Sequence, residues 1–213
     1  MSDDQPAPAI ESVAGTGVPM RGNDIDTDQI IPAQYLKVVT FEGLGQFAFQ
    51  DQRFDDEGDP TDHPFNEDRF REASIMAVNA NFGSGSSREH APQALMRWGI
   101  DAIVGESFAE IFAGNCLALG IPTATADRET VTRVQDWIED NPDGEIELDV
   151  EAETLSYGEK TVDVEVDDTQ RTALLDGVWD TTAVMRDNFD AVRETARALP
   201  YIDEAEIPEA RDG

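Results

Sequence analysis

Apolar residues in the middle of the chain form short runs separated by amphipathic stretches. Short apolar runs are typical of buried strands, and apolar positions three and four residues apart are typical of helices. The predicted strands cover residues 73–79, 102–105 and 121–123, and the predicted helices cover residues 91–98 and 108–119. Ser107 is expected to cap the second helix, and Gly99 to end the first. This alternation predicts an α/β unit with parallel strands.

The C-terminal half of the chain has a different pattern. Apolar and polar residues alternate over 145–155 and 160–166, which predicts an antiparallel hairpin with one solvated, acidic face. Further helices are expected over residues 130–139, 169–176 and about 180–199.

Two polar segments are predicted to be irregular. Residues 18–31 are expected to form a loop that crosses the top of the core, and the acid-rich residues 50–68 a solvated loop or lid. The predicted fold is a single α/β domain over residues 13–202, with a mostly parallel sheet flanked by helices, an added antiparallel hairpin and C-terminal helices. Residues 1–12 and 203–213 are expected to be disordered tails.

The charge of the chain indicates the solvent in which the protein works more than the reaction that it catalyses. The chain has 46 Asp and Glu against 15 Lys and Arg, a formal net charge of −31. Nucleic acid and anionic membranes would be repelled, so neither is expected as a partner. The acids are spread along the whole chain, and their repulsion would destabilise a compact fold in dilute buffer. We interpret this as a halophilic adaptation to a salt-rich cytoplasm.

Location and metal content follow from what the sequence lacks. It contains no apolar stretch near the roughly 20 residues that span a bilayer, and its acidic, Pro-rich start resembles neither a signal peptide nor a basic transit peptide. A cytoplasmic protein is therefore expected. Cys116 is the one cysteine, so this chain alone cannot form a disulfide or hold an iron–sulfur cluster. It is expected to be a core thiol. With His63 and His90 the only histidines, expected at the surface or in caps, no metal site is predicted.

The run NFGSGSSREH at residues 81–90 carries the most chemical information. It lies between a predicted buried strand and a predicted helix, where backbone N–H groups favour a negatively charged oxygen. Its glycines allow a tight turn, and Arg88 provides a fork that can bind a carboxylate through two hydrogen bonds.

Four interpretations of this run were compared. A phosphate-binding loop requires a lysine that is absent, and a nucleophile elbow requires the order G-x-S-x-G, which is also absent. Ser86 with Glu89 fits a capping box, which would be purely structural. That interpretation leaves Ser87 and Arg88 unexplained. Carboxylate binding, with a serine that acts on a proton, accounts for all of them and is preferred.

Three motifs, in the same order along the chain as in a known family, indicate a family resemblance. GSGSSREHAPQAL at 83–95 is preceded by GNDIDTDQIIPAQYLK at 22–37 and followed by SFAEIFAGNCLALGIP at 107–122. Together they resemble the small subunits of 3-isopropylmalate dehydratase, which are similar to the swivel domain of aconitase. The similarity extends from about Gly22 to Ile202.

The resemblance implies a hydro-lyase that is active only with a large subunit. In this family the large subunit carries a 4Fe–4S cluster that takes the substrate hydroxyl as a Lewis acid, and the small subunit provides a serine base. By motif, the serine is Ser86, Arg88 holds a substrate carboxylate, and Asp28 belongs to the acid–base network. Gly85 and Ser87 are expected to contact the substrate. The implied reaction interconverts 2- and 3-isopropylmalate in leucine biosynthesis.

Specificity is expected to depend on Leu36, Lys37, Val38 and Val39. Relatives that act on citrate have an arginine just beyond this point, and Val39 takes its place here, which suits an isopropyl group. Packing in the core is the alternative explanation of this segment. Two alternative functions also stay open: a related dehydratase for methylmalate/citraconate or homoaconitate-type acids, and a carboxylate-binding module without catalysis.

Overall fold

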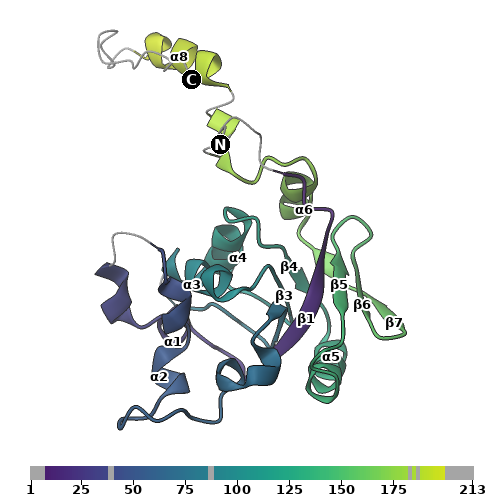
Figure 1. Ribbon diagram of the computed structural model, residues 1–213. Helices are drawn as coiled ribbons and strands as arrows, with labels where there is room; N and C mark the ends of the chain where they lie inside the picture. Colours follow the sequence, from purple (N-terminus) through teal and green to yellow (C-terminus); the bar gives the residue numbers. More distant parts are fainter. Residues whose placement is uncertain (1–7, 38–40, 86–88, 182–183, 186–187, 200–213) are drawn as a thin grey trace.

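The computed structural model describes residues 8–37, 41–85, 89–181, 184–185 and 188–199. One sheet of eight strands runs through the described domain (Figure 1). The strands are β1 (Ser12–Met20), β2 (Ala73–Val78), β3 (Ala102–Gly105), β4 (Thr123–Thr125), β5 (Ile146–Asp149), β6 (Thr154–Tyr157), β7 (Lys160–Asp163) and β8 (Glu165–Val166). Their order across the sheet is β7-β6-β5-β1-β2-β3-β4-β8.

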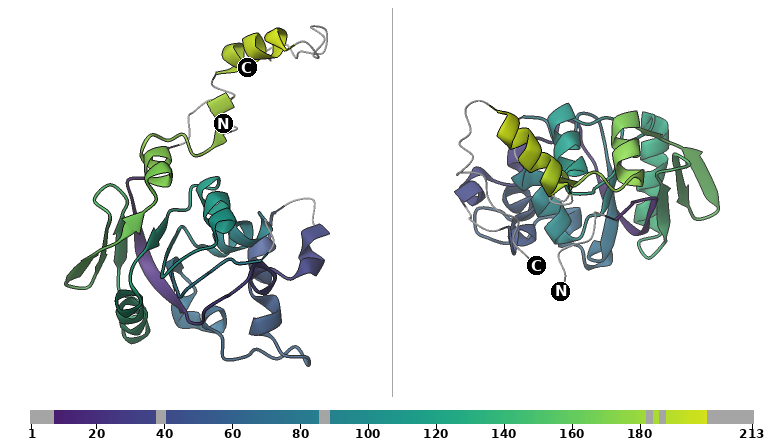
Figure 2. Two further views of the ribbon diagram at one scale, coloured as in Figure 1. Left: turned by 180° about the vertical axis from the view of Figure 1, so that it is seen from behind. Right: turned by 90° about the horizontal axis from the view of Figure 1, so that it is seen from above.

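Helices connect and cover these strands. The α-helices are α1 (Thr27–Ile30), α2 (Gln50–Arg53), α3 (His90–Trp98), α4 (Glu110–Leu117), α5 (Arg128–Asp140), α6 (Asp168–Leu175) and α8 (Phe189–Ala198). Short 3₁₀ helices are η1 (Ala33–Lys37), η2 (Leu44–Phe47), η3 (Pro64–Asn66) and η4 (Asp68–Phe70). Figure 2 shows α5 beside β1, away from α3 and α4, and α8 projecting from the domain beyond α6.

The parallel centre of the sheet is the predicted α/β unit. Strands β1, β2, β3 and β4 pair in parallel, and α3 and α4 are the crossover helices between β2, β3 and β4. All four residues of β3 are buried, as expected for a strand with both faces covered. The mixed α/β architecture with a mostly parallel sheet is thus as predicted. The carboxyl ends of β1, β2 and β3 lie along one edge of the sheet.

The predicted irregular segment at 18–31 is wrong in two places, because Val18 to Met20 belong to β1 and Thr27 to Ile30 form α1. The apolar residues of strand β1 are interrupted by small and polar ones, including Gly15 and Gly17. A side chain at Gly17 would lie 2.7 Å from atoms of Ile138 and Ile146, so the tight packing of neighbours explains this glycine. The strand signal was hidden by residues that only tertiary contacts require.

The predicted hairpin is also incomplete. Residues 146–163 form three antiparallel strands, β5, β6 and β7, and β5 adds this meander to β1. Strand β8 leaves the meander and pairs antiparallel with β4 at the opposite edge. The predicted cap at Ser107 is also wrong, because α4 begins at Glu110 and its N-cap residue is Ala109.

Residues near the N-terminal end of the described chain form hydrogen bonds with residues of its C-terminal part. The N–H of Ile10 donates to the carbonyl of Leu174 (2.9 Å), and the indole N–H of Trp179 donates to the carbonyl of Pro8 (3.0 Å). The ordered domain therefore includes part of the predicted N-terminal tail. The remaining domain boundaries stay a prediction, because residues 1–7 and 200–213 lie outside the described residues.

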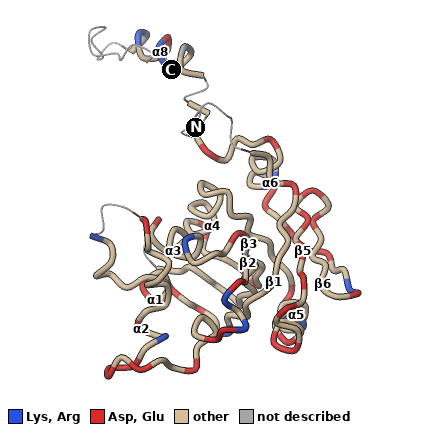
Figure 3. Tube along the Cα trace, viewed as in Figure 1, with Lys and Arg blue, Asp and Glu red and all other residues tan. Residues whose placement is uncertain are grey.

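Acidic side chains occur on many described elements, including α2, α5 and the β5–β6 hairpin, but not on α3 or on the parallel strands β1, β2, β3 and β4 (Figure 3). The ion pairs between described residues are mostly exposed, and an exposed pair typically contributes only about 0–1 kcal/mol. The acid excess is therefore spread over the surface instead of being neutralised in a core. Whether this reflects salt adaptation stays a prediction.

Candidate active site

Three chain segments meet at the carboxyl edge of the parallel strands. Residues 21–28 follow β1, residues 79–85 follow β2, and residues 106–109 follow β3. In open α/β sheets, ligands bind outside the carboxyl ends of strands. The predicted site residues Asp28 and Gly85 both lie here, on the first two of these segments.

Backbone hydrogen bonds fix the first two segments to each other. The N–H of Asp24 donates to Ala80 O (2.9 Å), and the N–H of Gly83 donates to Ile25 O (2.8 Å). The N–H of Thr27 donates to Ser84 O (2.9 Å). The short helix that contains Asp28 is therefore held beside the turn that ends at Gly85. Periodicity and motif spacing did not predict this pairing.

Local sequence explains the position of Asp28. Asp26 caps α1: its Oδ1 accepts from the N–H of Gln29 (2.8 Å), and Gln29 Oε1 accepts from the N–H of Asp26 (2.8 Å). This reciprocal pair is a capping box, and it fixes where the helix starts. Asp28 lies in the first turn and is exposed to solvent, as a residue that contacts a ligand must be.

The two glycines of the turn are needed for different reasons. Gly83 has φ +76°, and a side chain there would lie 2.5 Å from Phe112 Cδ2. Gly85 has φ +95°, but the nearest atom to an added Cβ is Asp26 Cβ at 3.5 Å. Gly83 thus serves both conformation and packing, whereas Gly85 serves conformation, because an added Cβ there would make only ordinary van der Waals contacts with the described atoms.

Several predicted site residues lie outside the described residues, namely Ser86, Ser87, Arg88, Val38 and Val39. Their roles stay predictions.

The capping box considered at the start of α3 pairs Ser86 with Glu89, and Ser86 lies outside the described residues, so it stays a prediction. Helix α3 begins at His90, directly after Glu89. Glu89 Oε1 accepts from Gln93 Nε2 (3.2 Å).

The residues on both sides of 38–40 make aromatic contacts. Tyr35 in η1 stacks on Phe47, with ring centroids 4.0 Å apart. Leu36 is half-buried and Lys37 is exposed. Just beyond this segment, Phe41 packs edge-on against His90 at 5.2 Å. The chain on both sides of residues 38–40 is therefore fixed by aromatic contacts, one of them with α3.

Sequence reasoning missed a set of amide side chains that fasten the site edge. Asn79 Oδ1 accepts from the N–H of Gly22 (3.0 Å), and Asn79 Nδ2 donates to Glu106 Oε1 (2.7 Å). The buried Gln135 on α5 donates through Nε2 to Ala77 O (3.1 Å) and to Asn79 Oδ1 (3.3 Å). Asn79 follows β2 directly, and a polar residue at that edge of the sheet was the available signal.

Arg21, at the end of β1, is engaged within the protein. Its Nε donates to Glu139 Oε1 (2.9 Å) and its Nη2 to Asp136 Oδ1 (2.6 Å). The hydrogen bond with Glu139, and further that with Asp136, raise the pKa of Arg21 above its usual value despite partial burial. This guanidinium therefore fastens α5 to β1 and is not free to bind a substrate carboxylate.

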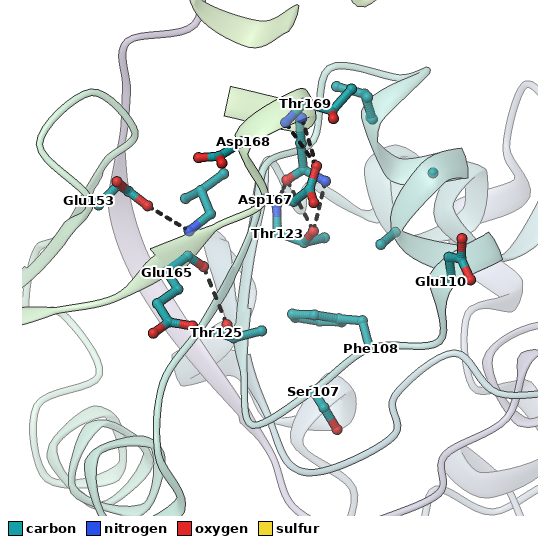
Figure 4. Close-up of a pocket in the computed structure, with 15 residues that line it drawn as sticks. Ser107, Phe108, Glu110, Thr123, Thr125, Glu153, Glu165, Asp167, Asp168 and Thr169 are labelled. Carbon is teal, nitrogen blue, oxygen red and sulfur yellow. Dashed lines mark hydrogen bonds between the residues drawn. The ribbon is translucent and has the colours of Figure 1, made fainter. Parts of the chain in front are cut away.

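A large cavity lies elsewhere (Figure 4). Its volume is about 860 Å³, and it lies between α4, the ends of β4 and β8, and the start of α6. Its acidic lining residues are Glu110, Glu153, Glu165, Asp167 and Asp168, and no lysine or arginine lines it. A dicarboxylate would be repelled there, so this cavity is not the substrate site.

The described residues do not fit an iron–sulfur cluster. None of them form a group of three or more His, Cys, Asp or Glu side chains that could hold a metal ion. Cys116 is fully buried on α4, as predicted, and burial raises the pKa of its thiol, so the thiolate that a metal requires is disfavoured. No described helix has the length and apolar character to cross a bilayer.

Comparison with known proteins defines the class. The family model of the aconitase C-terminal domain matches residues 7–129. A crystal structure of a 3-isopropylmalate dehydratase from Methanocaldococcus jannaschii shares the fold, with a TM-score of 0.62 at 24% sequence identity. The match covers 86% of this chain and 99% of that chain.

Curated relatives narrow the class to one family. The 3-isopropylmalate dehydratase small subunit of a Thermus thermophilus strain is 46% identical over 189 residues, or 89% of this chain and 94% of that protein. The small subunit of the same name from Synechocystis is 45% identical over 193 residues, covering 91% and 95%. The chain belongs to the family of 3-isopropylmalate dehydratase small subunits, which confirms the resemblance predicted from the sequence.

Proposed function

We propose that this chain is the small subunit of a heteromeric hydro-lyase that interconverts 2- and 3-isopropylmalate by dehydration and rehydration. The relatives at 45–46% identity support this, since they match nearly the full length of the chain and are named as small subunits of that dehydratase. Leucine biosynthesis is the corresponding pathway. A cytoplasmic location agrees with such a role.

The observation that carries the proposal is the pairing of the two site segments. Three backbone hydrogen bonds hold residues 24–27 against residues 80–84, which places Asp28 on the same edge as Gly85. Ser86 follows Gly85 in sequence. In the proposal, Ser86 removes a proton from the substrate carbon, Asp28 belongs to the proton-transfer network, and Arg88 binds a carboxylate.

A serine hydroxyl is a weak base without help. Its pKa must be lowered by N–H donors and by positive charge, and the turn amides with Arg88 would supply both. In this proposal Gly85 and Ser87 contribute backbone contacts to the substrate. Glycine at position 85 supports this, because a residue without a side chain lets a substrate oxygen approach the backbone closely.

The proposal requires a partner. The described residues contain no group of three or more His, Cys, Asp or Glu side chains that could hold a metal ion, and the buried Cys116 is the only cysteine of the chain. A 4Fe–4S cluster, which supplies Lewis acidity in this family, is therefore assigned to the large subunit. The proposed substrate is a small dicarboxylic acid, and residues 36–39 are proposed to contact its isopropyl group.

The test is turnover of 3-isopropylmalate by this chain mixed anaerobically with its cluster-loaded large subunit, in about molar KCl. Ser86→Ala should abolish turnover while the two subunits still co-elute in size-exclusion chromatography. Ser156→Ala is the matched control, because Ser156 lies on β6 in the meander and bonds only to Thr161 Oγ1 among the described side chains (3.0 Å).

Each outcome has a defined meaning. Unchanged turnover in Ser86→Ala would contradict the role of the serine. Turnover of methylmalate or a tricarboxylic acid, without turnover of isopropylmalate, would agree with the mechanism but overturn the specificity assigned to residues 36–39. No turnover of any of these acids would favour a binding module instead.

A further inference from the structure

The site edge contains an excursion of the chain that links all three segments. Between the hydrogen bonds Asp24–Ala80 and Ile25–Gly83, the segment after β2 has two extra residues, Asn81 and Phe82. The segment after β1 has none at this point. The chain after β2 therefore leaves its partner and returns to it within three residues.

The segment after β3 holds the outer side of this excursion. The N–H of Phe82 donates to Ser107 O (3.1 Å), and Phe82 O accepts from the N–H of Ala109 (2.9 Å). The N–H of Asn81 donates to Ser107 Oγ (2.8 Å). This explains Ser107: its hydroxyl accepts from the site turn instead of capping α4.

On the inner side, the link is made by a side chain. Asn81 Nδ2 donates to Asp24 Oδ1 at 2.8 Å. Both residues have left-handed backbones, with φ +57° at Asp24 and +57° at Asn81. Side-chain-bearing residues seldom adopt this conformation, though Asn and Asp tolerate it best, and strained positions of this kind are concentrated at functional sites.

We propose that Asn81 and Asp24 are positioning residues, which act through their hydrogen bond to set how the turn at 83–85 faces the helix of Asp28. The inference rests on the proposed function, because it assigns these residues to the same reaction. Neither side chain is proposed to touch the substrate. A small displacement of catalytic groups can lower turnover about 100-fold, so the geometry of this link is expected to matter for kcat.

The pair allows a reciprocal exchange. Asn81→Asp places two carboxylates opposite each other, which removes the donor and adds repulsion. Asp24→Asn alone keeps an acceptor for Asn81. The double variant Asn81→Asp with Asp24→Asn restores one donor and one acceptor in reversed order, at positions where both residue types tolerate the backbone.

The experiment measures kcat and KM of the reconstituted two-subunit enzyme, together with the melting temperature of each variant. Asn81→Asp is expected to lower kcat about 10- to 100-fold while KM changes less than about 3-fold. The double variant is expected to recover kcat to within about 3-fold of wild type. Asn141→Asp is the matched control, since Asn141 is an exposed residue whose Nδ2 bonds to Trp137 O (2.9 Å) at the end of α5.

The outcomes separate this inference from the proposed function. If the wild-type complex turns over, an unchanged kcat in Asn81→Asp would overturn the positioning role but not the proposed function. A double variant with a kcat as low as that of Asn81→Asp would do the same. If the decrease in kcat is proportional to the decrease in melting temperature in every variant, the hydrogen bond has a merely structural role. That result would also overturn the positioning role. No turnover by the wild-type complex would overturn the proposed function, and the positioning role with it.

Discussion

Replacement of Gly83 by alanine tests the packing beneath the site turn. The new Cβ would lie 2.5 Å from Cδ2 and 2.6 Å from Cβ of Phe112, a ring that is 2% exposed. Phe112 also packs edge-on against Phe82, with centroids 5.3 Å apart, so the ring has little room to move. Overpacking of this kind costs about 1–3 kcal/mol.

Backbone strain adds to the packing cost. Gly83 has φ +76°, and a left-handed conformation costs a residue with a side chain about 1–2 kcal/mol. The sum is about 2–5 kcal/mol of unfolding free energy. For a chain of this size, each kcal/mol lowers the melting temperature by about 2–4 °C, which gives a decrease of about 4–20 °C.

Gly85→Ala is the matched control. Gly85 has φ +95°, but its added Cβ would meet no atom of the described residues closer than 3.5 Å, so it retains only the strain cost of about 1–2 kcal/mol. Both variants would be compared with wild type by urea and thermal unfolding of the isolated chain in the same molar KCl buffer. Equal losses in the two variants would refute the packing argument, as would a Gly83→Ala variant that melts like wild type.

Two further predictions concern solvent conditions. Lowering KCl from about 1 M to about 0.01 M lengthens screening from about 3 Å to about 30 Å, so the net charge of −31 should unfold the chain; an unchanged circular dichroism signal would contradict salt adaptation. Burial, with a smaller contribution from nearby Arg53, lowers the pKa of His63 to about 4. Because the unfolded histidine binds its proton near pH 6.5, stability should be lost as the pH falls from about 6.5 to 4. His63→Asn keeps an acceptor for the N–H of Phe65 and removes this titration, so in urea unfolding at pH 7 and pH 5 it should lose less stability than wild type; equal losses would contradict the assignment.

His63 shows how far local sequence reasoning extended. Its expected capping role is confirmed, because Nδ1 accepts from the N–H of Phe65 (3.1 Å) ahead of η3. The alternative surface location is wrong, since His63 is only 7% exposed and lies against Phe49 and Phe65. A cap depends on residues two positions apart, whereas burial depends on aromatic side chains brought from elsewhere in the chain.

The sequence by itself determined the parallel unit and the family. Buried strands such as β2 have apolar runs, here residues 75–78, and Gly99 ends α3 with φ +128° as a residue without a side chain can. These signals are local, and each lies within about ten residues. The motif at 83–95 identified the family in the same way, since its glycines, serines and arginine lie close together in the sequence.

Only the tertiary structure decided how the site segments are joined. The glycines of β1 are explained by Ser74, Ile138 and Ile146, which approach from distant parts of the chain. The pairing of residues 24–27 with 80–84 links positions more than fifty residues apart, and no periodicity records it. Hydrogen bonds of this kind form after the strands have brought their carboxyl ends to one edge, so their partners are set by the fold and not by neighbours in sequence.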